Sequence, residues 1–159
     1  MSIIRPENFY HFGISVADLD ASSREITAIT GSRWTEPLEF EQLTRFDGAD
    51  REMKFTVIYS LEAPHYELIQ AAPETPFASP SRQGAVHHLG YWTDDFRGDL
   101  KKMRELGYQE EVVGLDEHHE PWGFAYFVTH SGRRLEIADR STFEPTWDEF
   151  LLAHAAGGK

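Results

Sequence analysis

Two histidines and two glutamates recur at matching places in the two halves of this 159-residue chain. The recurring stretches are YHFGISV at residues 10–16 and HHLGYWT at 87–93, followed by YELI at 66–69 and LEIA at 135–138. His11 thus aligns with His88, and Glu67 aligns with Glu136. Imidazole nitrogens and carboxylate oxygens are common ligands of divalent metal ions. A repeat that preserves these four side chains, and little else that is polar, predicts a metal site.

The elements that must position these side chains also follow one order in each half. Strand patterns and turn residues predict strands at 9–16, 39–46, 53–60 and 65–70, and again at 85–93, 110–115, 124–130 and 133–138. Asp18 and Asp95 are suited to cap a helix after the first strand of each half, and Gly31 to end the first of these helices. The second helix has an expected apolar face formed by Phe96, Leu100, Met103 and Leu106. A last helix is expected at 147–155.

This order of strand, helix and three strands, written twice, predicts an α+β fold with two βαβββ modules forming a curved-sheet cleft. The expected boundaries are 9–70 for the first module, 71–84 for a linker, 85–139 for the second module and 140–159 for a C-terminal helical extension, together one domain. Because side chains alternate between the faces of a strand, three residues are predicted to share the cleft-facing side with the ligands. These substrate-pocket candidates are His65, Trp92 and Arg134.

The composition restricts both the ligands and the partners. The chain has no cysteine, so a metal ion would be held by nitrogen and oxygen atoms alone. Its 27 acidic side chains against 15 Lys and Arg give a net charge of −12, which disfavours nucleic acid and anionic membrane surfaces. The sequence has neither a signal-peptide pattern nor an apolar run of membrane-spanning length, so a cytoplasmic protein is expected.

Each candidate ligand also has a purely structural interpretation. A single histidine in a strand is more often a core residue, and only the equivalent positions of His11 and His88 favour metal binding. A glutamate in an apolar strand is costly to desolvate unless it is paired or metal-bound, so a buried ion pair is the alternative for Glu67 and Glu136. The adjacent histidines at 118 and 119 are interpreted as part of an acidic loop rather than as ligands.

These residues resemble the vicinal oxygen chelate superfamily, which includes glyoxalase I, methylmalonyl-CoA epimerase, extradiol dioxygenases and the bleomycin and fosfomycin resistance proteins. The resemblance covers residues 9–139. In that family paired βαβββ modules form the cleft, and the metal ligands come from the first and fourth strands of each module. Those places hold His11, Glu67, His88 and Glu136. The string HHLGYW with a downstream Arg-x-Glu is similar to glyoxalase-like proteins in particular.

The ligand set distinguishes among family members. Extradiol dioxygenases use two histidines and one glutamate around iron, whereas the additional Glu67 resembles the two-histidine, two-glutamate site of glyoxalase I. The epimerase usually has glutamine at the place of Glu67, so this chain departs from it there. Bleomycin-binding members often lack the metal set altogether.

The resemblance implies a divalent-metal-dependent lyase or isomerase of the glyoxalase type, acting on a small molecule with vicinal oxygens through a metal-stabilised enediolate. The ion would be one of Zn, Ni, Co, Mn or Fe. Glu136 is the first candidate for the general base and Glu67 the second. An Fe(II) extradiol-type dioxygenase and a non-catalytic drug-binding or resistance protein are the alternatives. A homodimer is expected, because family members commonly pair modules.

Overall fold

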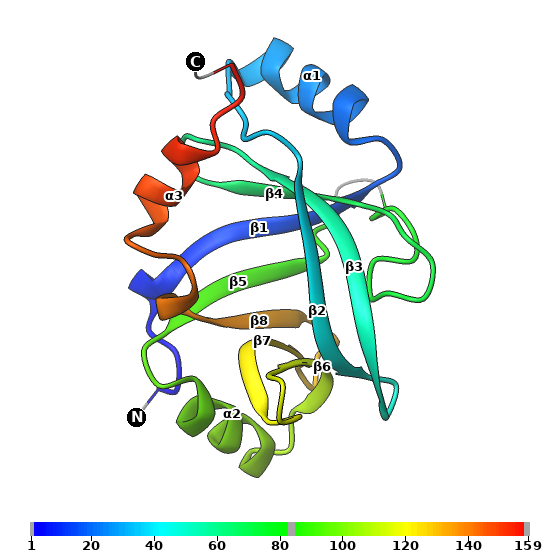
Figure 1. Ribbon diagram of the computed structural model, residues 1–159, viewed down its shortest axis with the longest axis vertical. Helices are drawn as coiled ribbons and strands as arrows, with labels where there is room; N and C mark the ends of the chain where they lie inside the picture. Colours follow the sequence, from blue (N-terminus) through cyan, green and yellow to red (C-terminus); the bar gives the residue numbers. More distant parts are fainter. Residues whose placement is uncertain (1, 83–84, 158–159) are drawn as a thin grey trace. The chain divides into compact units, whose positions relative to one another are not determined.

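The computed structural model describes residues 2–82 and 85–157, which form three α-helices and eight β-strands (Figure 1). The strands are β1 Phe9–Val16, β2 Leu38–Phe46, β3 Ala49–Tyr59, β4 Tyr66–Gln70, β5 His88–Thr93, β6 Gln109–Leu115, β7 Pro121–Val128 and β8 Arg134–Asp139. The α-helices are α1 Leu19–Thr30, α2 Phe96–Glu105 and α3 Trp147–Ala153, and two 3-10 helices span Pro6–Asn8 and Arg140–Thr142. No helix within the described ranges is long and apolar enough to cross a membrane.

The order of elements confirms the α+β class and the repeated βαβββ pattern. The predicted strands are all present, with shifted ends: β3 begins at Ala49 rather than at residue 53, and β5 at His88 rather than at residue 85. The longer β3 follows from a tight turn, because Asp47 and Gly48 both adopt the left-handed backbone that a two-residue hairpin needs. The ends of the expected linker and C-terminal extension, residues 83–84 and 158–159, lie outside the described residues.

The chain groups into two compact units that do not coincide with the two halves of the sequence. The first unit comprises Met1–Tyr10, Glu41–Met53 and His88–Thr142, and the second comprises His11–Phe40, Lys54–His87 and Phe143–Lys159. In the first unit β5 pairs in parallel with β8, β8 and β6 flank β7 in antiparallel pairs, and the end of β2 pairs with β6. In the second unit β4 lies between β1, its parallel partner, and β3, its antiparallel partner.

The strand register gives the repeat a physical explanation. Across the parallel pair β1–β4, Glu67 lies opposite Gly13, two residues after His11. Across the parallel pair β5–β8, Glu136 lies opposite Gly90, two residues after His88. Residues two apart on a strand share a face, so each histidine lies diagonally beside its glutamate. The residue opposite each glutamate is thus a glycine, which carries no side chain.

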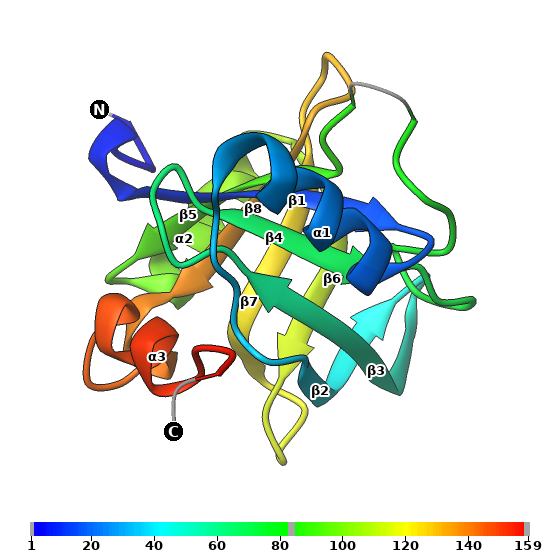
Figure 2. The ribbon, with the colours of Figure 1, turned by 90° about the horizontal axis from the view of Figure 1, so that it is seen from above.

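The two module helices are anchored to different extents. Both begin as predicted, since Asp18 and Asp95 accept hydrogen bonds from backbone N–H groups in the first turn. Helix α2 buries Phe96, Leu100 and Met103 in the core of the first unit. Helix α1 lies against β4 but has no buried residue (Figure 2).

The apolar face predicted for α2 was wrong at its last position. Leu106 is 57% exposed, because the helix ends at Glu105 and Leu106 serves as its C-cap. Helix α3 is likewise shorter than expected. It ends at Ala153, and Ala155 instead forms an isolated β-bridge with Thr35.

Candidate metal centre

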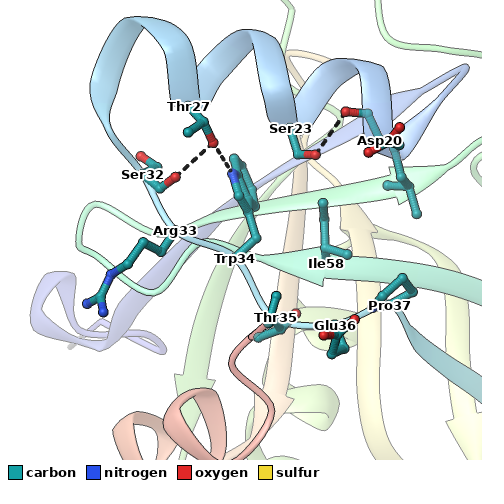
Figure 3. A pocket seen from close by; sticks show the side chains of 12 residues that line it. Asp20, Ser23, Thr27, Ser32, Arg33, Trp34, Thr35, Glu36, Pro37 and Ile58 are labelled. Carbon is teal, nitrogen blue, oxygen red and sulfur yellow. Dashed lines mark hydrogen bonds between the residues drawn. The ribbon is translucent and has the colours of Figure 1, made fainter. Parts of the chain in front are cut away.

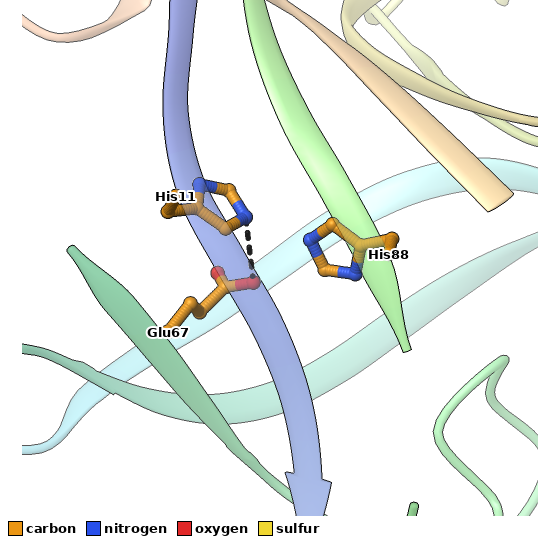
Figure 4. A group of neighbouring side chains, drawn as sticks. All are labelled: His11, Glu67 and His88. Carbon is orange, nitrogen blue, oxygen red and sulfur yellow. Dashed lines mark ion pairs between the residues drawn. The ribbon is translucent and has the colours of Figure 1, made fainter. Parts of the chain in front are cut away.

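His11 and Glu67 form a buried pair in the second unit (Figure 4). His11 is fully buried and Glu67 is 5% exposed, and 3.2 Å separates His11 Nε2 from Glu67 Oε2. The other carboxylate oxygen, Oε1, accepts a hydrogen bond of 2.6 Å from the phenol of Tyr59. The two oxygens of Glu67 therefore have different neighbours, an imidazole on one side and a phenol on the other.

His88 and Glu136 form the corresponding pair in the first unit. His88 is 1% exposed and Glu136 is 7% exposed, and 3.4 Å separates His88 Nε2 from Glu136 Oε2. The same oxygen, Oε2, accepts a hydrogen bond of 3.0 Å from the phenol of Tyr10. The ring of Tyr126 packs on the His88 imidazole, with 4.8 Å between the ring centroids. Here one carboxylate oxygen has both the imidazole and the phenol as neighbours.

In each pair the imidazole nitrogen and the carboxylate oxygen are spaced as two ligands of a metal ion would be, and also as the members of a buried ion pair would be. Nitrogen and oxygen ligands bind such ions at about 2.0–2.2 Å, so adjacent donor atoms at tetrahedral or octahedral angles lie roughly 2.8–3.6 Å apart. The separations of 3.2 Å and 3.4 Å fall within that range. His11, Glu67 and His88 are buried side chains that could hold a metal ion. These three side chains thus fit the predicted divalent metal ion.

A model of the glyoxalase/bleomycin resistance protein/dioxygenase superfamily matches residues 10–126. The chain belongs to this superfamily. The match confirms the resemblance drawn from the repeated strings, and no curated protein matches the chain.

Solved structures share the fold at low sequence identity. A hypothetical protein from Bacillus halodurans is 12% identical with a TM-score of 0.60, over 82% of this chain and 92% of that chain. A variant of Streptomyces coelicolor methylmalonyl-CoA epimerase in complex with 2-nitronate-propionyl-CoA is 15% identical with a TM-score of 0.52, over 87% and 95% of the two chains. The epimerase from Mycobacterium tuberculosis is 13% identical with a TM-score of 0.52, over 87% and 90%.

The three substrate-pocket candidates all have protein partners. Trp92 is 4% exposed and stacks on Tyr10, with 3.7 Å between the ring centroids. Arg134 pairs with Glu111 through both Nε and an Nη atom. His65 is half-buried, and 2.9 Å separates its Nδ1 from the Ser60 carbonyl oxygen. Their roles toward a substrate stay predictions.

The tyrosines beside the two glutamates were missed by the sequence analysis. Tyr59 lies opposite Glu67 across the pair β3–β4, and Tyr126 lies opposite Glu136 across the pair β7–β8. These tyrosines are therefore equivalent in the repeat. Their distances along the chain to the glutamates differ, eight residues against ten, because the connecting turns differ in length. Only the register makes them equivalent, so the one usable signal was an aromatic residue in the preceding strand of each half.

The remaining histidines of interest have structural partners. In the loop between β6 and β7, the ring of His119 is 2.8 Å from Asp50, which also accepts hydrogen bonds from Arg45. The guanidinium of Arg45, and then the imidazole of His119, lower the pKa of Asp50. Backbone N–H groups of Glu120 and His118 lower the pKa of Asp116, the residue that organises this loop. These contacts agree with the interpretation of an acidic loop.

A surface groove of about 450 Å³ lies within the second unit, between α1, the segment 32–37 and the start of the C-terminal tail (Figure 3). Trp34 lines it and donates a hydrogen bond of 2.9 Å from Nε1 to Thr27 of α1. None of the candidate ligands lines this groove. The groove is therefore separate from the candidate ligands themselves.

Proposed function

We propose that His11, Glu67, His88 and Glu136 bind one divalent ion, and that the chain is a lyase or isomerase of the glyoxalase type. The observation that carries the proposal is the duplicated buried pair, with imidazole and carboxylate atoms 3.2 Å and 3.4 Å apart. Removing two carboxylates from water is costly, and a shared cation would help to offset that cost for both glutamates. Membership of the superfamily supports the same set, since it contains metal-dependent enzymes with ligands at these places.

In this proposal the ion, when bound, acts as a Lewis acid toward negative charge that develops on two adjacent substrate oxygens. The protein supplies the proton transfer. A carboxylate oxygen of Glu136 removes the proton next to a substrate carbonyl and returns it at the neighbouring carbon, which requires hydrogen-bond reach to both positions. Glu67 holds its place, because the phenol of Tyr59 already restrains one of its oxygens.

The charge of the protein favours a small neutral or aromatic substrate with vicinal oxygens. The net charge of −12 repels strongly anionic molecules unless a local cation offsets it. Arg134 is the cationic candidate nearest in sequence to Glu136, and Glu111 already balances its charge. A CoA thioester is therefore a less favourable substrate than an α-ketoaldehyde adduct or a vicinal-oxygen aromatic.

Metal analysis of the purified chain tests the proposal against both alternatives. We expect one tightly bound non-iron divalent ion per four-ligand set, and turnover of a proton-transfer substrate. Bound iron with oxygen consumption on a catechol would establish the dioxygenase instead. A protein without metal that sequesters an aromatic drug would establish the binding protein. A metal-soaked crystal with the four side chains beyond roughly 4 Å from any ion, far from the usual 2.0–2.2 Å, would exclude this ligand set.

We also propose a homodimer. Trp122, at the start of β7, is 46% exposed, and an exposed large aromatic side chain of this kind is suited to an interface between copies. Light scattering across a concentration series should give about twice the chain mass of 18.3 kDa. A constant monomer mass would end this idea.

A further inference from the structure

Tyr59 connects Glu67 to the C-terminal helix. Its phenol donates the 2.6 Å hydrogen bond to Glu67 Oε1, and its ring meets Trp147 edge-on, with 4.9 Å between centroids and 85° between planes. Trp147 is the first residue of α3. This helix lies outside residues 10–126, the part that the superfamily model matches. A segment outside the matched residues thus contacts the partner of a candidate ligand.

The backbone of Tyr59 is held by the same part of the second unit. The N–H of Thr35 donates to the carbonyl of Tyr59 at 2.9 Å, and the N–H of Tyr59 donates to Thr35 Oγ1 at 3.1 Å. On either side of Thr35, the segment bonds to the C-terminal tail: Glu36 N–H donates to the carbonyl of His154, and Ala156 N–H donates to the carbonyl of Trp34. The tail and α3 therefore support both the backbone and the ring of Tyr59.

The ring of Trp147 is itself fixed by its neighbours. Phe143 meets it edge-on at 5.3 Å and Phe150 stacks on it at 5.8 Å, with both distances measured between ring centroids. His65 meets the same indole edge-on at 5.9 Å. Aromatic pairs of this kind restrict ring orientation as well as burying area. A restrained indole gives Tyr59 one preferred position, and that position decides where its hydroxyl points.

We propose that Tyr59 is a positioning residue that keeps Glu67 a one-oxygen metal ligand, and that α3 sets Tyr59 through Trp147. This inference rests on the proposed function. With Oε1 bonded to the phenol, only Oε2, the oxygen beside His11 Nε2, is presented to an ion. Without the phenol, both oxygens can bind, which changes the number of ligand atoms on the ion. Hydrogen-bond partners of ligating carboxylates tune metal affinity in this way.

The test uses the full-length protein with Co²⁺ as the probe, because the visible absorption of Co²⁺ depends on how many atoms coordinate it. Tyr59→Phe keeps the ring and removes only the hydroxyl. We expect it to bind Co²⁺ about 10–100-fold more weakly in a chelator competition, and to shift and weaken the visible bands. The matched control is Tyr108→Phe, whose ring packs on the core of the first unit and on His130. That variant should bind and absorb as the wild type does.

A second pair of variants tests the contribution of α3. Trp147→Leu removes the ring that touches Tyr59, and should show the same spectral shift with an intermediate loss of affinity. The matched control is Leu152→Ala, a 65% exposed residue of the same helix that lies outside the aromatic cluster, and it should leave the spectrum unchanged. Thermal unfolding of the metal-free variants separates lost packing from lost positioning.

The outcomes distinguish the two proposals. A wild type that binds no Co²⁺ overturns the metal site and this inference together. A wild type that binds, with Tyr59→Phe equal to it in affinity and spectrum, overturns only the role of Tyr59. A wild-type spectrum for Trp147→Leu, equal to that of Leu152→Ala, overturns only the role of α3.

Discussion

The two histidine–glutamate pairs have the same strand register, but they differ in which carboxylate oxygen accepts a hydrogen bond from a tyrosine. In the His11–Glu67 pair the phenol of Tyr59 donates to Oε1, whereas Oε2 is the oxygen beside the imidazole. In the His88–Glu136 pair the phenol of Tyr10 donates to Oε2, which is also the oxygen beside the imidazole. A metal ion could bind Glu67 Oε2 without displacing the phenol of Tyr59, whereas at Glu136 it would compete with Tyr10 for Oε2. The comparison suggests a fixed ligand in one pair and an exchangeable carboxylate in the other, as a general base requires.

The largest effect should come from removing the base. Glu136→Gln should lower kcat by about 10²–10⁴-fold, because an amide can occupy the same space but cannot take a proton. Glu67→Gln should reduce kcat far less. Both are measured with metal content verified, so that lost metal is not counted as lost chemistry. If Glu136→Gln retains full turnover with metal bound, the base lies elsewhere, and Glu67 or His65 becomes the candidate.

Metal affinity should separate the ligands by type. His88→Ala removes a donor atom completely and should weaken binding by more than about 100-fold, beyond the effect typical of residues that only support a ligand. Glu67→Gln should weaken it less, because an amide oxygen can still coordinate. Isothermal titration with Zn²⁺ measures both. Equal losses would show that the amide of Glu67→Gln does not replace the carboxylate as a ligand.

The module helices offer a second contrast between the halves. Leu100→Ala in α2 should lower the free energy of unfolding by about 2–5 kcal/mol, because Leu100 is 2% exposed within the first core. Ile29→Ala in α1 should change it by less than about 0.5 kcal/mol, since Ile29 is 79% exposed. Urea unfolding monitored by circular dichroism checks both values. A large effect at Ile29 would mean that a partner covers α1.

Tyr10 and Tyr59 should respond to the same substitution with opposite sign. Tyr10→Phe keeps the ring stacked on Trp92 and removes the hydroxyl that competes for Glu136 Oε2. It should therefore bind Co²⁺ as tightly as the wild type or more tightly, whereas Tyr59→Phe binds more weakly. Parallel losses in the two variants would remove the distinction between the pairs.

The smallest effect concerns pH and lies away from the site. Arg45 and His119 lower the pKa of Asp50, so the ionised form is favoured in the folded protein. The resulting stabilisation is present above the ordinary aspartate pKa and is lost as the pH falls through the lower folded value. Asp50→Asn should thus be slightly less stable than the wild type near pH 6, and the gap should narrow toward pH 3. A gap that widens in acid would contradict this sign.

The sequence alone determined the repeat and the side chains that are candidates for chemistry. Local signals sufficed for the capping aspartates Asp18 and Asp95 and for the order of the strands, because capping and alternation act over a few residues. The equivalence of His11 with His88, and of Glu67 with Glu136, followed from their places in the same pattern. The ends of β3 and of α3 were misjudged, since hairpin geometry and a bridge to Thr35 decided them.

What only the tertiary structure decided is the surroundings of those four side chains. Tyr59 and Tyr126 reach the glutamates through the register of neighbouring strands, and Trp147 reaches Tyr59 by packing of an element distant in the sequence. No short pattern encodes such contacts. Side-chain geometry decides which carboxylate oxygen accepts the hydrogen bond from each phenol. The sequence determined which atoms are available for chemistry, and packing decided how each of them is held, because long-range contacts depend on the whole fold.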